Sequence, residues 1–190
     1  MSQFFNGRGG SAGSRGCTTH EGTMNPNEIT IAKIIPFELE RIEEAAAQPD
    51  EVDAELLPFF EEEASAELQA IETLLRVWDG EVSEKAVEPL KQLRRHFHTL
   101  KGAANSIGHI RIGALASGME DLCAQFNPAY AFVLRTRIIK TNIIVLVTIR
   151  SLLQEARQPQ FCRVKKEQII EAAQSIVRLR DRGIELKGAA

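Results

Sequence analysis

Residues 90–108 have the sequence LKQLRRHFHTLKGAANSIG, and their pattern decides the fold. Apolar side chains recur in steps of three and four, as expected for one buried helix face: Leu90, Leu93, Phe97, Leu100, Ala104 and Ile107. At about 100° per residue, His98 points roughly 130° away from the centre of that face. Gly102 follows one turn later on the same outward side, although a glycine inside a helix costs about 1 kcal/mol relative to alanine. An exposed imidazole beside a missing side chain indicates a place where another molecule approaches closely.

The same periodicity predicts further helices on both sides of this one. We expect helices over 53–78, from 83 or 85 to 107, and over 110–126, 129–156 and 164–186. Breaks fall at Asp79-Gly80, Gly108, Asn127-Pro128 and Gln158-Pro159. Since no strand pattern competes, the sequence predicts an all-α, antiparallel four-helix bundle (up-down-up-down) with an additional N-terminal and/or C-terminal helix.

The chain divides into four parts by composition. Residues 1–27 are rich in Gly, Ser, Asn and Thr, which predicts a disordered tail. We expect a short helical leader over 28–50, the bundle over 51–157, and a C-terminal helix over 163–187 that packs on the bundle. The run IIKTNIIVLVTI at 138–149 is unusually apolar for a bundle helix, so we expect it to pack on an extra helix or on a second chain.

Composition excludes several classes of function. A net charge of -3 in 190 residues leaves no basic footprint for nucleic-acid binding. The three cysteines, Cys17, Cys123 and Cys162, are odd in number and far apart, which favours incidental thiols in a reducing compartment over disulfides or a zinc site. No segment has the pattern of a signal peptide or of a membrane span, so we expect a cytoplasmic protein with no membrane partner.

A carboxylate is predicted to lie beside the exposed histidine. His98 and Glu120 stand eleven residues to either side of the turn at His109, so each lies about 16 Å from the turn along its own helix. At that level Glu120 can accept a hydrogen bond from Nδ1 of the ring, which leaves Nε2 as an unprotonated nucleophile. Arg95 and Lys101 flank the same outward face, and their positive field suits a phosphoryl group better than a metal ion.

These parts permit phosphoryl transfer through a phosphohistidine. His98 is the expected phosphoryl acceptor, and Lys101 is expected to neutralise phosphoryl oxygens. Gly102, which has no side chain, is expected to leave room for the partner to approach. The chain offers no carboxylate cluster for magnesium, so we expect no cofactor of its own and activating groups from a partner. The remaining basic residues near the site have plainer interpretations: Arg94 and Arg95 as solvated or intrahelical ion-pair residues, and His96 and His109 as structural residues, with His20 in the tail. A metal site from His96, His98 and His109 fails because helix positions two apart do not face each other.

Two stretches resemble a known family. RRHFHTLKGAANSIG at 94–108, followed by ALASGMEDL at 114–122, resembles the histidine phosphotransfer (HPt) domain, in which His98, Lys101 and Gly102 match the family's motif. LLPFFEEEASAELQAIETLL at 56–75 is similar to the first helix of such domains in chemotaxis-type and twitching-type histidine kinases. The resemblance covers about 52–126, and a polar residue at the position of Glu120 is shared with those relatives.

The resemblance implies a phosphorelay intermediate of two-component signal transduction. It would carry phosphate between a histidine kinase or receiver domain and another receiver's aspartate, with Mg²⁺ in the partner receiver. It implies a carrier and not an autonomous enzyme, either free-standing or the HPt portion of a longer kinase, since no Asp-x-Gly-x-Gly nucleotide signature is present. The alternatives are a non-phosphorylated helical scaffold that docks the same partners and an ATP-using kinase fragment. Donor, acceptor and output stay open, and a monomer is favoured.

Overall fold

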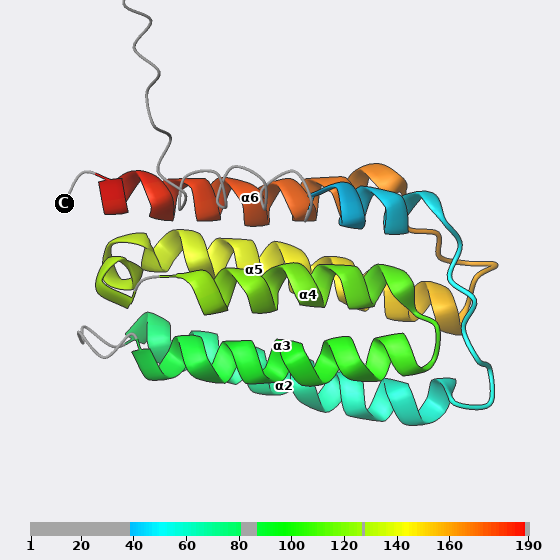
Figure 1. Ribbon diagram of the computed structural model, residues 1–190. Coiled ribbons are helices and arrows are strands. Elements are labelled where there is room, and N and C mark those ends of the chain that lie inside the picture. The colour runs from blue at the N-terminus through cyan, green and yellow to red at the C-terminus, as the bar shows by residue number, and fades with distance from the viewer. Residues whose placement is uncertain (1–38, 81–86, 127, 189–190) are drawn as a thin grey trace, which may run out of the picture.

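A computed structural model of the chain describes residues 39–80, 87–126 and 128–188, which form helices joined by short connections (Figure 1). Residues 39–47 are helical and form the leading helix. The helices that follow are α2 (Leu57–Gly80), α3 (Val87–Ser106), α4 (Ile110–Gln125), α5 (Pro128–Arg157) and α6 (Lys166–Gly188). None of the described residues lies in a strand, which confirms the predicted all-α class. No helix in this part of the chain is long and apolar enough to cross a membrane.

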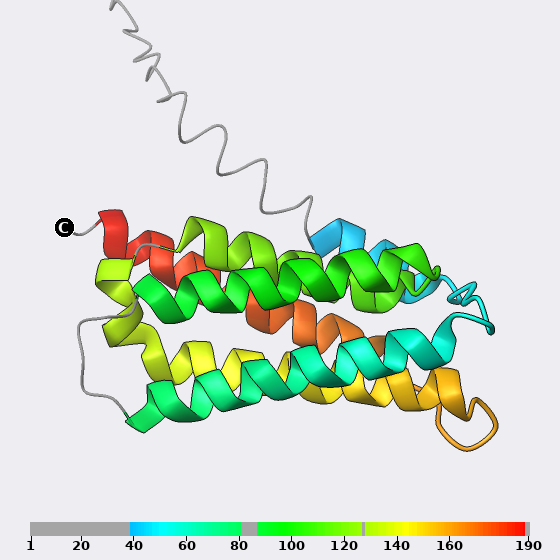
Figure 2. The same ribbon diagram turned by 90° about the horizontal axis from the view of Figure 1, so that it is seen from below.

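Four of the helices close into a ring. α2 packs against α3, α3 against α4, α4 against α5, and α5 back against α2. Each runs antiparallel to the helix before it, and α6 lies along the outside of α4 and α5 (Figures 1 and 2). The structure therefore has the predicted bundle, with both a leading and a C-terminal helix added to it.

The predicted apolar face of residues 90–107 is the buried face of α3. All six of its side chains are at most 5% exposed. The matching face of α2 contributes Phe60, Ala64, Leu68, Ile71 and Leu75 to the same core. Burial of these two stripes fixes the rotation of α3 about its own axis, and the opposite side of the helix, which carries His98, is left to solvent.

α4 is buried on nearly every side, which the sequence pattern did not predict. It lies against α3, α5 and α6, and its small residues let these neighbours approach closely. A Cβ atom added at Gly118 would lie 3.2 Å from Ile42 Cδ1 and 3.3 Å from Ile176 Cδ1. The leading helix and α6 therefore meet over this glycine, and α4 becomes the central element of the molecule.

The predicted ends of two helices were wrong: α2 was expected over 53–78, and α6, expected over 164–186, runs from Lys166 to Gly188. α2 begins at Leu57 and not at Asp53, because the Asp53 carboxylate accepts a hydrogen bond from the Glu55 N–H (2.9 Å) and holds 53–56 in a turn. At its other end α2 continues to Gly80, because a last-turn glycine is tolerated where the chain leaves the helix. The predicted disordered tail, the first part of the predicted leader (28–38) and the start of the next helix at 83 or 85 lie outside the described residues.

The turn between α3 and α4 requires a glycine. Gly108 has a φ of 79°, and a Cβ atom there would lie 2.3 Å from the backbone oxygen of Glu51. The Asp53 N–H also donates to the Ile107 carbonyl (2.9 Å), so residues 51–53 lie directly against the turn. The predicted glycine at the end of α3 is confirmed, and the close contact fixes how α3 and α4 are aligned.

Candidate functional site

His98 lies on the outward side of α3 with its side chain 67% exposed. Its Nδ1 atom is 2.9 Å from Oε1 of Glu120, which α4 presents at the same level of the bundle. The Glu120 side chain is only 11% exposed, because the neighbouring helices surround α4. The pairing expected from the positions of the two residues about the turn is therefore present. No described residue forms a hydrogen bond with Nε2, the other ring nitrogen.

Glu120 is held in its ionised form by two partners. Its second oxygen, Oε2, accepts a hydrogen bond from Nζ of Lys101. Burial acts to raise the pKa of Glu120, but the hydrogen bonds from Lys101 and His98 outweigh it and hold the pKa below its ordinary value of 4.5. An anionic carboxylate accepts from Nδ1–H, so the contact selects the ring tautomer in which Nε2 carries a lone pair.

Lys101 lies one turn after His98, and its side chain is about a quarter exposed. It is paired with Glu120 and not extended into solvent beside Nε2. The ammonium group therefore adjoins the carboxylate that orients the ring. Its role toward phosphoryl oxygens stays a prediction.

The surface beside His98 is open at Gly102. A Cβ atom added there would meet nothing within 4 Å, so no packing inside the chain requires a glycine at this position. Arg94 and Arg95 are exposed on the same helix and form no ion pair with a described residue. The site is thus an exposed imidazole on a smooth, positively charged stretch of α3.

The other residues near the site are structural in this arrangement. His96 points to the other flank of α3, where its Nδ1 lies 2.7 Å from Oε2 of Glu67 in α2. Cys123 follows Glu120 by one turn, but burial raises the pKa of its thiol to about 12, which makes it a poor nucleophile. Among the residues that the structure describes, no three His, Cys, Asp or Glu side chains gather to hold a metal ion.

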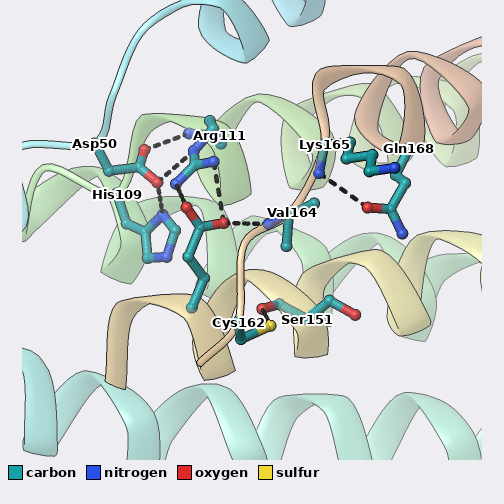
Figure 3. A network of polar contacts seen from close by, with 9 residues as sticks. Asp50, His109, Arg111, Ser151, Cys162, Val164, Lys165 and Gln168 are labelled. Atoms are coloured by element: carbon teal, nitrogen blue, oxygen red, sulfur yellow. Dashed lines mark hydrogen bonds and ion pairs between the residues drawn. The ribbon is translucent and has the colours of Figure 1, made fainter. Parts of the chain in front are cut away.

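A buried polar network that sequence reasoning missed lies at the turn end of the bundle (Figure 3). Asp50 Oδ2 lies 2.8 Å from Nδ1 of His109 and 2.7 Å from Nε of Arg111. Arg111 also reaches Glu155 at 3.4 Å, and Glu155 accepts the Val164 N–H at 2.8 Å. His109 is fully buried, which agrees with its expected structural role.

This network joins four segments that are distant in the sequence. It ties the segment after the leading helix to the α3–α4 turn, the end of α5 and the connection to α6. Asp50 and Arg111 are 61 residues apart, so no local pattern indicated their contact. The local sequence signals for this network are Pro49-Asp50 and the residues His109 and Arg111 at the α3–α4 turn. Residues of these types are also common in solvent-exposed turns, so they did not indicate a buried contact.

Comparison with known protein families gives a match that contains the site. The family described as "Hpt domain" matches residues 55–159. This range spans α2 to α5 and contains His98, Lys101, Gly102 and Glu120; it leaves out the leading helix and α6. No curated protein and no solved structure shows significant similarity to the chain.

Proposed function

Because this chain belongs to the Hpt domain family, we propose that His98 is the residue that carries the phosphoryl group in a phosphorelay. Domains of this family perform histidine phosphotransfer in two-component signalling, and they interact with receiver domains and kinases. They are phosphotransfer carriers and not catalytic kinase domains. The proposal assigns the family's chemistry to one atom, Nε2 of His98.

One observation carries this assignment. Nδ1 of the exposed His98 ring is 2.9 Å from a buried, ionised carboxylate, and Nε2 has no partner among the described residues. In the transfer, the Nε2 lone pair attacks phosphorus, the bond from phosphorus to the donor's aspartate oxygen breaks, and the aspartate leaves as a carboxylate. Nδ1 keeps its proton, which stays hydrogen-bonded to Glu120, so the positive charge that develops on the ring is stabilised. Transfer to a receiver runs through the same steps in reverse.

Lys101 and Gly102 complete the proposed site. Lys101 is one turn from the ring, and exchange of its contact from Glu120 to a phosphoryl oxygen would bring a cation to the developing charge. Gly102 leaves free the space that an approaching receiver would occupy. Mg²⁺ is expected in the acidic site of that receiver and would supply charge neutralisation there, so this chain needs only to present and orient the imidazole.

The partners in the proposal are a receiver-domain aspartate on one side and a histidine kinase or second receiver on the other. The likeness of residues 56–75 to chemotaxis-type and twitching-type kinases supports a partner from such a system. The competing function is a scaffold that docks these partners without accepting phosphate. The two functions differ in whether His98 becomes phosphorylated.

Phosphorylation of the full chain tests the proposal. A receiver domain primed with radiolabelled acetyl phosphate and Mg²⁺ is mixed with wild-type protein, with His98→Gln and with His96→Gln. We expect acid-labile, base-stable label in the wild type and in His96→Gln, and none in His98→Gln. His96→Gln is the matched control because it removes a histidine two residues away whose ring is also paired with a glutamate.

Two results would contradict the proposal. Label that persists in His98→Gln would place the phosphoryl group on another residue. A wild-type protein that binds the receiver but stays unlabelled, while a known HPt domain in the same assay is labelled, would leave the scaffold function.

A further inference from the structure

The edge of the bundle formed by α2 and α5 lies opposite the edge that carries His98. In the ring of contacts, α3 and α4 form one edge, and α2 and α5 form the other (Figure 2). α6 covers α4 and α5 from a third side. A partner that binds to the α2–α5 edge would therefore leave His98 and Glu120 accessible.

This edge exposes large apolar side chains that no described element covers. Ile143 and Val147, one turn apart on α5, are 51% and 57% exposed. Ile144 adds a further exposed side chain on α5. A contiguous set of this kind is typical of a protein interaction surface.

The apolar side chains line a groove between the two helices. The groove has a volume of about 330 Å³, and its apolar walls are Leu75, Ile139, Ile143, Leu146 and Val147. Arg76 and Arg150 lie at its margins, together with Glu72, which is ion-paired with Arg150. A concave apolar channel between two helices fits the ridge of side chains on a third helix.

The charge of α5 indicates the chemistry of the partner. Residues 128–154 contain four cations and no Asp or Glu, in a chain whose net charge is -3. Lys140, one turn before Ile143 and Ile144 on α5, is exposed and forms no ion pair with a described residue. Arg76 extends the positive charge onto α2. Beside the groove the cations Arg76, Lys140 and Arg150 therefore outnumber the carboxylate of Glu72.

We propose that the α2–α5 groove is a docking site for an acidic amphipathic helix of a partner protein. The helix would place apolar side chains between α2 and α5 and carboxylates against Arg76 and Lys140. From Ile139 to Arg150 the groove runs about 16 Å, the length of a helix of about three turns. The shape favours a helix over a membrane surface, because a bilayer would rest on the crests of α2 and α5 and leave the groove unfilled.

This inference does not depend on the phosphoacceptor. A partner on the α2–α5 edge and a receiver at His98 would bind at the same time, so the chain would hold one protein while it exchanges phosphate with another.

Peptide binding to the full chain tests the proposal. Two fluorescein-labelled helical peptides of about 15 residues share one leucine pattern and carry either glutamate or lysine at the polar positions. Fluorescence anisotropy should show binding of the glutamate peptide only, weakened by added salt. The double variant Ile143→Ser with Val147→Ser, and separately Lys140→Glu, should each weaken that binding at least tenfold. Phe161→Ser, in the connection after α5 and 81% exposed, is the matched control and should bind like the wild type.

The remaining outcomes each overturn the proposal. Equal binding of both peptides, or binding that survives in the double variant and in Lys140→Glu, would mean that the groove does not recognise an acidic helix. Binding to phosphatidylserine vesicles, without binding of the glutamate peptide, would assign the face to an anionic membrane. A dimer in analytical ultracentrifugation that the double variant abolishes would assign it to a second copy of the chain. Thermal unfolding of each variant separates loss of binding from loss of fold, and the exposed position of Lys140 makes Lys140→Glu the variant least dependent on packing.

Discussion

At the scale of single residues, the proposed reactivity of His98 depends on a hydrogen bond to a side chain that never touches phosphate. Glu120→Ala removes the partner of Nδ1 and also the partner of Lys101. A charge-assisted hydrogen bond contributes about 1.5–3 kcal/mol, so we expect phosphorylation of His98 to slow by about 10- to 100-fold. The ¹⁵N shifts of the ring should change at the same time from one tautomer to a mixture.

Glu120→Gln separates the effect of charge from that of geometry. Its amide oxygen still accepts from Nδ1–H, so the tautomer should be kept while the rate falls less than in Glu120→Ala. A Glu120→Ala variant with the wild-type rate and tautomer would show that the carboxylate has no part in orienting the ring.

Two glycines of this region should respond to alanine in opposite directions. Gly102→Ala meets no atom within 4 Å and should stabilise α3 by about 1 kcal/mol, because alanine has the higher helix propensity. Gly108→Ala should destabilise the protein by at least about 1–2 kcal/mol, because its positive φ disfavours a side chain and the new Cβ would contact the Glu51 backbone. Urea unfolding of both variants measures the two free energies.

Substitution of Gly102 should also change the rate of phosphotransfer. If the glycine serves receiver docking, Gly102→Ala should be more stable and yet slower in transfer, and Gly102→Leu slower still. A Gly102→Leu variant that transfers phosphate at the wild-type rate would mean that the open surface at Gly102 is not used.

At the scale of elements, the network around Asp50 joins the leading segment to the α3–α4 turn, and it should make the stability of the protein sensitive to acid. Burial acts to raise the pKa of Asp50, but the contacts with His109 and Arg111 outweigh it and hold the pKa below 3.8. A carboxyl whose pKa is lowered on folding stabilises the protein above its unfolded pKa, and this contribution is lost as the pH falls through the folded value. Stability should therefore fall below about pH 4, and Asp50→Asn should remove part of that dependence.

The same variant should be costly at neutral pH. Removal of one partner from a buried ion pair costs about 3–5 kcal/mol, and Glu155 keeps Arg111 partly paired, so we expect about 3 kcal/mol for Asp50→Asn. Glu72→Gln, which breaks the more exposed pair with Arg150, is the control and should cost under about 1 kcal/mol. Equal costs in urea unfolding at pH 7 would contradict a special role for the network.

Local periodicity and short turns explain which contacts were predictable. The α3 stripe follows from 3–4 spacing alone, and the pairing of His98 with Glu120 follows from equal distances to one tight turn. The contact of Asp50 with Arg111 depends on where a leading segment 61 residues away returns to the bundle, which no local pattern encodes. The burial of α4 on nearly every side was missed for a similar reason, since its small residues indicate close neighbours only once α6 and the leading helix are in place.

At the scale of the whole molecule, the region that matches the family is not the whole packing unit. Residues 55–159 leave out α6, whose Ile169, Ile176 and Leu179 are at most 3% exposed against the bundle. Burial of a large apolar side chain contributes about 1.5–3 kcal/mol, so these three together contribute roughly 5–9 kcal/mol. The total stability of a domain is only about 5–15 kcal/mol, so α6 accounts for a large part of it.

A truncation tests this dependence. A fragment of residues 39–159 lacks α6 and exposes the faces of α4 and α5 that it covers, whereas a fragment of 39–190 keeps every described helix. We expect 39–190 to unfold cooperatively near the temperature of the full chain, and 39–159 to unfold at a much lower temperature or to aggregate in size-exclusion chromatography. Because α4 carries Glu120, loss of α6 should also broaden the ¹⁵N signals of the His98 ring. If 39–159 keeps both the melting temperature and the tautomer of the full chain, the four-helix bundle is self-sufficient and α6 is an addition without influence on the site.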